Sequence, residues 1–212
     1  MGIAEKLKAI QTNLKDEVVL VAVSKTKSNA DILQAYNSGH RIFGENKVQE
    51  LIQKQEELPK DIQWHMIGHL QSNKVKYIAP FISLIHGVDS LKLLTEINKR
   101  AEQNKRIIDC LLQMHIATES SKFGFGINEL EDTLIAVQEF KNINIKGLMG
   151  IATFTNDRTQ ITKEFSDLKM VFNQIRTSEI NTLSIGMSGD YQIAIENGST
   201  MIRIGSAIFG AR

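Results

Sequence analysis

A chain of 212 residues has the size of one compact domain, expected to span residues 1–212, and its 25 Lys and Arg nearly balance its 24 Asp and Glu. The formal net charge of +1 gives no broad field for nucleic acid or an anionic membrane, so neither is an expected partner. The single cysteine, Cys110, excludes an intrachain disulfide, and no apolar stretch is long enough to cross a membrane, which makes the cytoplasm the expected location.

Residues 1–14 carry Glu and Lys throughout and predict an amphipathic helix rather than a leader peptide. Beyond them, short β-rich runs alternate with segments whose apolar residues recur every three or four positions, as in helices. The strand candidates are residues 18–24, 41–44, 62–68, 81–88, 107–116, 143–149, 180–187 and 200–205. The helix candidates are residues 29–39, 45–58, 91–105, 127–140 and 159–175, with a further helix beginning near Asp190.

Eight strand and helix units predict an α/β fold, a single (β/α)8 TIM barrel with an additional N-terminal helix. An open, doubly wound sheet fits the same alternation, but such a sheet usually carries a GxGxxG turn after its first strand, where this chain reads SKTKSNA. In a closed barrel of this kind, active-site residues lie at the C-terminal ends of the strands. Candidate functional residues are therefore sought where the predicted strands end.

Lys25 directly follows the apolar run VVLVAVS, so its side chain is expected at the barrel mouth. Partial desolvation of a lysine at such a place favours the neutral amine, a nucleophile that can form an imine. A solvated loop lysine fits the same position, and position alone leaves both interpretations open. Lys27, two residues later, is a weaker candidate because it should already lie in the polar loop.

Two turns near the end of the chain have the composition of a phosphate site. Ser188 and Gly189 follow the seventh predicted strand and precede the helix expected near Asp190, while Gly205 and Ser206 follow the eighth. Backbone N–H groups and a serine hydroxyl at such a place can bind phosphate, and barrels commonly bind phosphate after strands seven and eight. A plain capped turn, with Ser188 or Asp190 as the helix N-cap, fits the same residues.

Arg203 lies between Ile202 and Ile204 in the last predicted strand. An unpaired guanidinium in apolar surroundings is costly, so Arg203 is expected to meet a carboxylate, a phosphate or a ring acceptor. An ion pair with a neighbouring strand is the alternative without a ligand.

His65 and His69 are four residues apart, but they fall on a predicted strand and turn, where helical spacing does not apply, and no further ligands accompany them. No metal site is therefore expected. We expect His65 inside the barrel with a hydrogen-bond partner and His69 at the mouth, near a ligand. His86 and His115 are expected to be hydrogen-bonded interior groups.

The segments AVSKTKS, FGENKVQE, WHMIGHLQSNK, SSKFGF, GLMGIAT, LSIGMSGDYQIAI and RIGSAIFG, in this order, resemble the pyridoxal phosphate homeostasis protein family nearly end to end. The resemblance implies a fold similar to the N-terminal barrel of alanine racemases and pyridoxal 5'-phosphate (PLP) as the cofactor. It also implies that Lys25 holds PLP through a Schiff base.

Carried over residue by residue, the resemblance makes Ser188, Gly189, Gly205 and Ser206 phosphate contacts and places Arg203 at the pyridine nitrogen of PLP. A permanent cation there tends to leave that nitrogen unprotonated, which weakens the ring as an electron sink.

The resemblance further matches Asn46 to an asparagine near the cofactor and makes Met187 a neighbour of it. Lys122 matches a second family lysine, which the resemblance links to cofactor transfer or surface binding. Lys47 stands where the family usually has tyrosine and changes the charge near the mouth.

Racemisation by two bases needs an acid–base group on each face of the substrate, and this chain supplies only Lys25. The leading hypothesis is therefore a monomeric, non-catalytic carrier in PLP and vitamin B6 homeostasis, which passes PLP to apo-enzymes. A PLP-dependent, racemase-like enzyme acting on an unidentified amino acid is the second hypothesis. A Schiff-base aldolase for sugar phosphates, which needs no cofactor, is the third.

Overall fold

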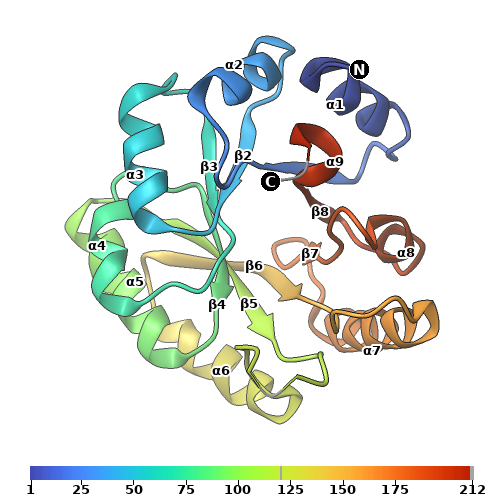
Figure 1. Cartoon of the computed structure of the whole chain (residues 1–212). Helices are drawn as coiled ribbons and strands as arrows, with labels where there is room; N and C mark the ends of the chain where they lie inside the picture. The colour runs from blue at the N-terminus through green and yellow to red at the C-terminus, as the bar shows by residue number, and fades with distance from the viewer. Residues whose placement is uncertain (120, 211–212) are drawn as a thin grey trace.

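The computed structural model describes residues 1–119 and 121–210, and within them eight parallel strands close into a barrel in chain order (Figure 1). The last strand pairs with the first, which confirms the predicted TIM barrel and rules out the open sheet. The strands are β1 Val19–Val23, β2 Ile42–Glu45, β3 Gln63–Met66, β4 Leu84–Val88, β5 Ile108–Met114, β6 Ile143–Gly150, β7 Thr182–Ser184 and β8 Met201–Ile204.

Helices surround the strands in a ring, with α1 beside α2 and α9 (Figure 1). The helices are α1 Ile3–Thr12, α2 Asn29–Asn37, α3 Val48–Glu57, α4 Val75–Ile78, α5 Leu91–Gln103, α6 Leu130–Ala136, α7 Arg158–Ile175, α8 Tyr191–Glu196 and α9 Ser206–Phe209. Short 3-10 turns flank α4 and α6, at Ser72–Lys74, Ile127–Glu129 and Val137–Glu139. The sequence pattern does not predict α4 and α9, and it predicts one longer helix over residues 127–140 in place of α6 and its flanking 3-10 turns.

Local sequence explains where several helices begin. Ser28 caps α2 by accepting a hydrogen bond from the Asp31 N–H, while the Asp31 carboxylate accepts from the Ser28 N–H, which satisfies two otherwise unpaired donors. Ser90 caps α5 in the same way through the Leu93 N–H. Along α5 the buried residues recur on one face, toward the barrel: Leu93, Leu94, Ile97 and Ala101.

The alternation of side chains along β1 separates two packed regions. Val21 belongs to a small cluster inside the barrel, against which Val19 also packs, whereas Leu20 and Ala22 face the larger core beneath the helices. Continued along β1, the same alternation carries Val23 and then Lys25 toward the barrel axis. The strand register therefore fixes the direction in which Lys25 leaves the sheet.

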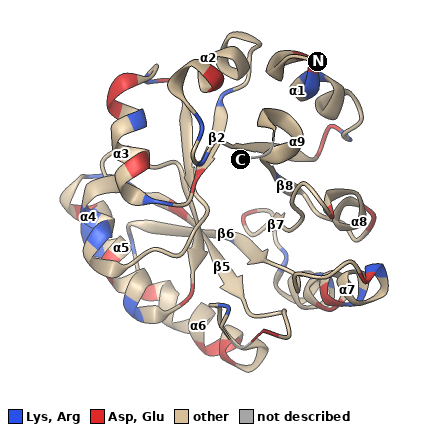
Figure 2. Cartoon of the chain, viewed as in Figure 1, with Lys and Arg blue, Asp and Glu red and all other residues tan. Residues whose placement is uncertain are grey.

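The outer surface carries charges of both signs, which are spread over helices such as α3, α5 and α7 (Figure 2). The described residues contain no helix that is both long enough and apolar enough to span a bilayer. Cys110 lies in β5 and is fully buried. Burial raises the pKa of its thiol, and the negative charge of the neighbouring Asp109 raises it further by a smaller amount.

Candidate functional site

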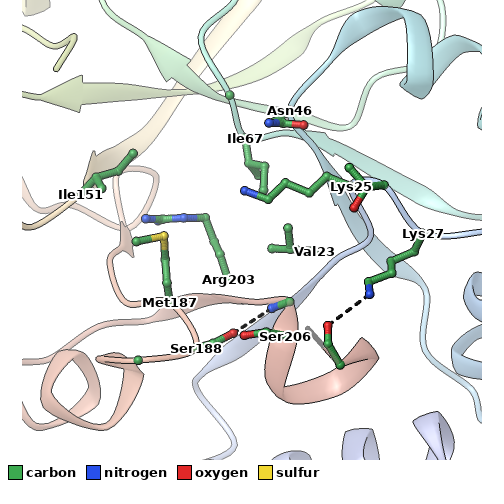
Figure 3. Close-up of a pocket in the computed structure, with 15 residues that line it drawn as sticks. Val23, Lys25, Lys27, Asn46, Ile67, Ile151, Met187, Ser188, Arg203 and Ser206 are labelled. Carbon is green, nitrogen blue, oxygen red and sulfur yellow. Dashed lines mark hydrogen bonds between the residues drawn. The ribbon is translucent and has the colours of Figure 1, made fainter. Parts of the chain in front are cut away.

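A cavity of about 470 Å³ opens where β1, β7 and β8 end (Figure 3). Its lining brings together segments from the beginning and the end of the chain. The cavity contains all eight residues predicted for the site, which are Lys25, Asn46, Met187, Ser188, Gly189, Arg203, Gly205 and Ser206. Their role in holding a cofactor stays a prediction, whereas their convergence on one cavity is a feature of the structure.

Lys25 is partly buried and points into this cavity from the first residues beyond β1 (Figure 3). Its position follows from the register of β1, because Val23, two residues earlier, lines the same cavity. Ile67 and Ile151 complete an apolar wall, and both follow strands whose inward positions are set by the same two-residue period. A lysine placed against apolar side chains is the arrangement that favours a nucleophilic amine.

The turns after β7 and β8 are tied together opposite Lys25. The Gly205 N–H donates a hydrogen bond to the Ser188 hydroxyl oxygen at 3.1 Å, so the hydroxyl joins the turns rather than capping α8 (Figure 3). The N–H groups of Gly189 and Ser206 make no hydrogen bond to another described residue. Backbone donors that converge in this way, beside serine hydroxyls, suit an anion such as phosphate.

The turn after β7 agrees only in part with the alternative of a plain turn in which Ser188 or Asp190 caps the following helix. Asp190 occupies the N-cap position of α8, yet its carboxylate accepts a hydrogen bond from the Met187 N–H at 2.5 Å and bonds to no helix N–H. The carboxylate therefore shapes the turn that presents Ser188 and Gly189.

Arg203 is buried inside the barrel end and makes three hydrogen bonds. Its guanidinium donates to the Ser184 carbonyl at 2.7 Å, to the Ser184 hydroxyl at 2.6 Å and to the Gly150 carbonyl at 2.9 Å. The ion pair considered from the sequence does not occur among the described residues. Burial lowers the pKa of Arg203 to about 10, against the opposing effect of the Asp190 charge, so the guanidinium stays charged at neutral pH.

A chain of hydrogen bonds continues from Arg203 through the barrel interior. The Ser184 hydroxyl accepts from Arg203 and lies 3.1 Å from His86 Nδ1, and His86 Nε2 lies 3.0 Å from His65 Nδ1. When the Ser184 hydroxyl donates its hydrogen to His86 Nδ1, the His86 proton lies on Nε2 and His65 Nδ1 is its acceptor. Burial lowers the pKa of both histidines, that of His65 to about 3, so both rings are neutral beside the Arg203 charge.

Close packing holds Asn46 at the mouth. A Cβ added to Gly68 would lie 2.6 Å from the Asn46 carbonyl oxygen and 2.8 Å from the Asn46 Cβ, so only glycine fits here. Met187 lines the cavity and is partly exposed. Lys47 occupies the N-cap position before α3, is exposed and does not line the cavity.

Lys27 was expected in the polar loop, but it contributes to the cavity. It lines the cavity, and its ammonium donates to the Gly210 carbonyl at 3.1 Å (Figure 3). The same ammonium also donates to the Phe209 carbonyl at 3.3 Å. Cations suit the C-terminal end of a helix, because carbonyls there lack N–H partners. Lys27 therefore ties the turn after β1 to the end of α9.

Two other candidates lie outside the cavity lining. His69 is near the mouth, where its Nδ1 lies 2.9 Å from an Asp89 carboxylate oxygen and its ring stacks on Phe123 at 3.8 Å. Lys122 donates to the Ala152 carbonyl at 2.6 Å and pairs with Glu119 at 3.0 Å. Ser120, from the same SSKFGF motif, lies outside the described residues.

Comparison with known proteins gives consistent results. The alanine racemase N-terminal domain family matches residues 2–212. The chain is 38% identical to the pyridoxal phosphate homeostasis protein of Pasteurella multocida, covering 100% of this chain and 98% of that protein. It is 43% identical to the protein of the same name in Helicobacter pylori, with 91% and 87% covered.

Solved structures show the same likeness. PipY of Synechococcus elongatus, 34% identical, superposes with a TM-score of 0.93 without PLP and 0.89 with PLP bound, covering 98% of this chain and 100% of PipY. Alanine racemase from E. faecalis, 16% identical, has a TM-score of 0.76 over 99% of this chain and 58% of the racemase. The racemase shares the barrel, and at this identity the likeness concerns the fold alone.

Proposed function

Because the chain belongs to the pyridoxal phosphate homeostasis protein family, whose barrel is the alanine racemase N-terminal domain, we propose that it binds PLP as a Schiff base to Lys25. We propose further that it acts in intracellular PLP homeostasis as a carrier. The observation that carries the proposal is the convergence of Lys25 and the two donor-rich turns on one cavity.

The hydrogen-bond donors of the two turns fit the phosphate end of PLP. The N–H groups and hydroxyls of Ser188, Gly189 and Ser206 suit the phosphate, which needs several hydrogen-bond donors. Gly205 keeps the backbone close, since a Cβ there would lie 3.3 Å from the Val23 carbonyl oxygen. PipY, a relative with the same fold, has been solved with PLP bound, which supports the assignment.

PLP supplies an aldehyde that an amine can capture, and a ring that can delocalise negative charge. Lys25 would supply the amine that forms the Schiff base with this aldehyde, with loss of water. Arg203, held by Ser184 and Gly150, keeps a fixed cation inside the barrel end, where we place the pyridine nitrogen. Asn46 and Met187 flank the bound ring in this proposal.

A carrier role is proposed in preference to racemase-like catalysis. Proton transfer on both faces of a substrate needs a second acid–base group opposite the Schiff-base lysine. The charged side chains in the described lining are Lys25, Lys27 and Arg203, and the last two donate to backbone carbonyls. Screening amino acids for exchange of the α-proton in deuterated water tests the choice, because exchange at an enzyme-like rate contradicts a pure carrier.

The attachment site is tested by borohydride reduction followed by peptide mass mapping. We expect the pyridoxyl group on Lys25, and its loss in Lys25→Ala. Lys27→Ala is the matched control, since this lysine lines the same cavity and should leave attachment intact. A colourless protein that takes up no PLP, or a label on Lys27 or Lys122, would overturn the proposal.

The same carrier proposal includes residues 1–212 as one PLP-binding domain, a monomeric cytoplasmic protein, and delivery of PLP to apo-enzymes. Delivery is supported by the position of the cavity at the surface of the barrel end. If PLP is delivered directly, the PLP-loaded protein should restore activity to a PLP-requiring apo-enzyme at a higher rate than the PLP that it releases into solution. Equal rates would indicate release into solution only.

A further inference from the structure

Three charged side chains that line no part of the cavity surround the backbone of Lys25 from outside. Lys54 of α3 is buried, with 6% of its side chain exposed, and its ammonium contacts two carboxylates, Glu45 at 2.8 Å and Glu50 at 2.6 Å. Glu45 is fully buried at the end of β2, and Glu50 lies one helical turn before Lys54. We name this group the Glu45–Lys54–Glu50 clamp.

The clamp contacts the peptide group on each side of Lys25. The Lys54 ammonium donates its third hydrogen bond to the Ser24 carbonyl at 2.8 Å, and the Ser24 hydroxyl donates to Glu45 at 2.6 Å. On the other side, the Thr26 N–H donates to the Glu50 carboxylate at 2.6 Å. Because these two peptide planes determine the backbone angles of Lys25, the clamp fixes the direction of its side chain.

The backbone conformation of the next residue indicates that the turn needs such support. Thr26 has a φ of +64°, in the left-handed region that a β-branched residue rarely adopts. A conformation of this kind persists only when surrounding contacts determine it. The hydrogen bond from the Thr26 N–H to Glu50 is one such contact, and the bond from Lys54 to the Ser24 carbonyl is another.

From this geometry we propose that Lys54, Glu45 and Glu50 are positioning residues for Lys25: they aim its amine into the cavity and so set the rate at which the Schiff base forms. The proposal rests on the proposed function, since it assumes that Lys25 reacts with PLP. The clamp itself touches no ligand in this account and acts only through the backbone of Lys25.

The test separates capture of the aldehyde from binding of the phosphate and ring. Pyridoxine 5'-phosphate carries an alcohol in place of the aldehyde and therefore binds without forming a Schiff base. Its dissociation constant, measured by calorimetry, reports the cavity alone. The rate of absorbance change on mixing with PLP reports reaction at Lys25.

Glu50→Ala removes the acceptor for Thr26 from a partly exposed position, and Glu50→Gln restores a carbonyl oxygen there. We expect Glu50→Ala to slow Schiff-base formation roughly tenfold to a hundredfold, as for a reactive group misplaced by about 1 Å, with pyridoxine 5'-phosphate affinity unchanged. Glu50→Gln should recover most of the rate. Lys54→Met, if it folds, should lose at least as much rate as Glu50→Ala.

Glu96→Ala is the matched control, because Glu96 forms an ion pair of the same spacing with Arg100 in α5 and is about as exposed as Glu50. It should change neither measurement. An unchanged rate in Glu50→Ala overturns the clamp, and so does a rate that falls together with pyridoxine 5'-phosphate affinity. Failure of the unmodified protein to form a Schiff base at all would instead overturn the proposed function.

Discussion

The two buried histidines inside the barrel predict that the protein loses stability as the pH falls below neutral. Burial lowers the pKa of His65 from 6.5 to about 3 and that of His86 well below 6.5, and neighbouring positive charge adds to the effect. Below pH 6.5 the unfolded chain therefore binds protons that the folded chain does not. The free energy of unfolding must fall with pH in this range.

The size of the fall follows from the ordinary pKa of histidine. Lowering the pH from 7 to 5.5 reduces the free energy of unfolding by about 1.3 kcal/mol for each histidine that stays neutral in the folded state, or by about 2.5 kcal/mol for the pair. His40, also buried, has a lowered pKa and acts in the same direction. Burial raises the pKa of Glu45, which acts in the opposite direction, because the folded state then binds the proton more readily.

Urea denaturation at constant ionic strength measures this fall, and His65→Gln isolates one of its sources. The glutamine amide oxygen can still accept from His86 Nε2, while the variant lacks one titrating group. We expect the variant to lose about 1.3 kcal/mol less than the unmodified protein between pH 7 and 5.5. Parallel pH profiles for the two proteins would refute the assignment of a neutral, buried His65.

Three further predictions concern single residues. Ser184→Ala removes the hydroxyl between Arg203 and the histidines, and it should lower the free energy of unfolding by about 1–3 kcal/mol in urea titrations, the cost of buried groups left without partners. Gly68→Ala should destabilise the protein by about 1–3 kcal/mol, because the added Cβ collides with Asn46, and thermal melting that matches the unmodified protein would contradict this close approach. Cys110 should react with a thiol reagent at mildly alkaline pH only after urea unfolds the chain, and rapid labelling of the folded protein would show that β5 is more accessible than its burial indicates.

The strands and the longer helices could be predicted because their periodicity is local. The apolar run ending at Ser24 and the alternation through Val23 indicated both a strand and the direction of Lys25. The helices α4 and α9 have four residues each, too few to leave a periodic signal, and they pack against neighbouring helices, α4 against α3 and α5 and α9 against α1.

The limits of prediction at the site have a physical cause as well. Arg203 was expected to need a charged or ring partner, but carbonyls and a hydroxyl from β6 and β7 supply its hydrogen bonds, and only the closed barrel brings them close. The contact between Lys54 and the Ser24 carbonyl joins residues 30 positions apart and has no sequence signal. The glycine and serine turns could be found because their composition itself favours anion binding.

The order of the segments around the cavity also bears on biosynthesis. One wall comes from the first strand and the opposite wall from residues 187–210, and these parts of the chain meet only when β8 pairs with β1. During translation, the amine at position 25 leaves the ribosome well before the turns that face it. A nascent chain therefore exposes that lysine without its pocket until synthesis has passed Gly210, so under the proposed function ligand capture must await the segment that ends there.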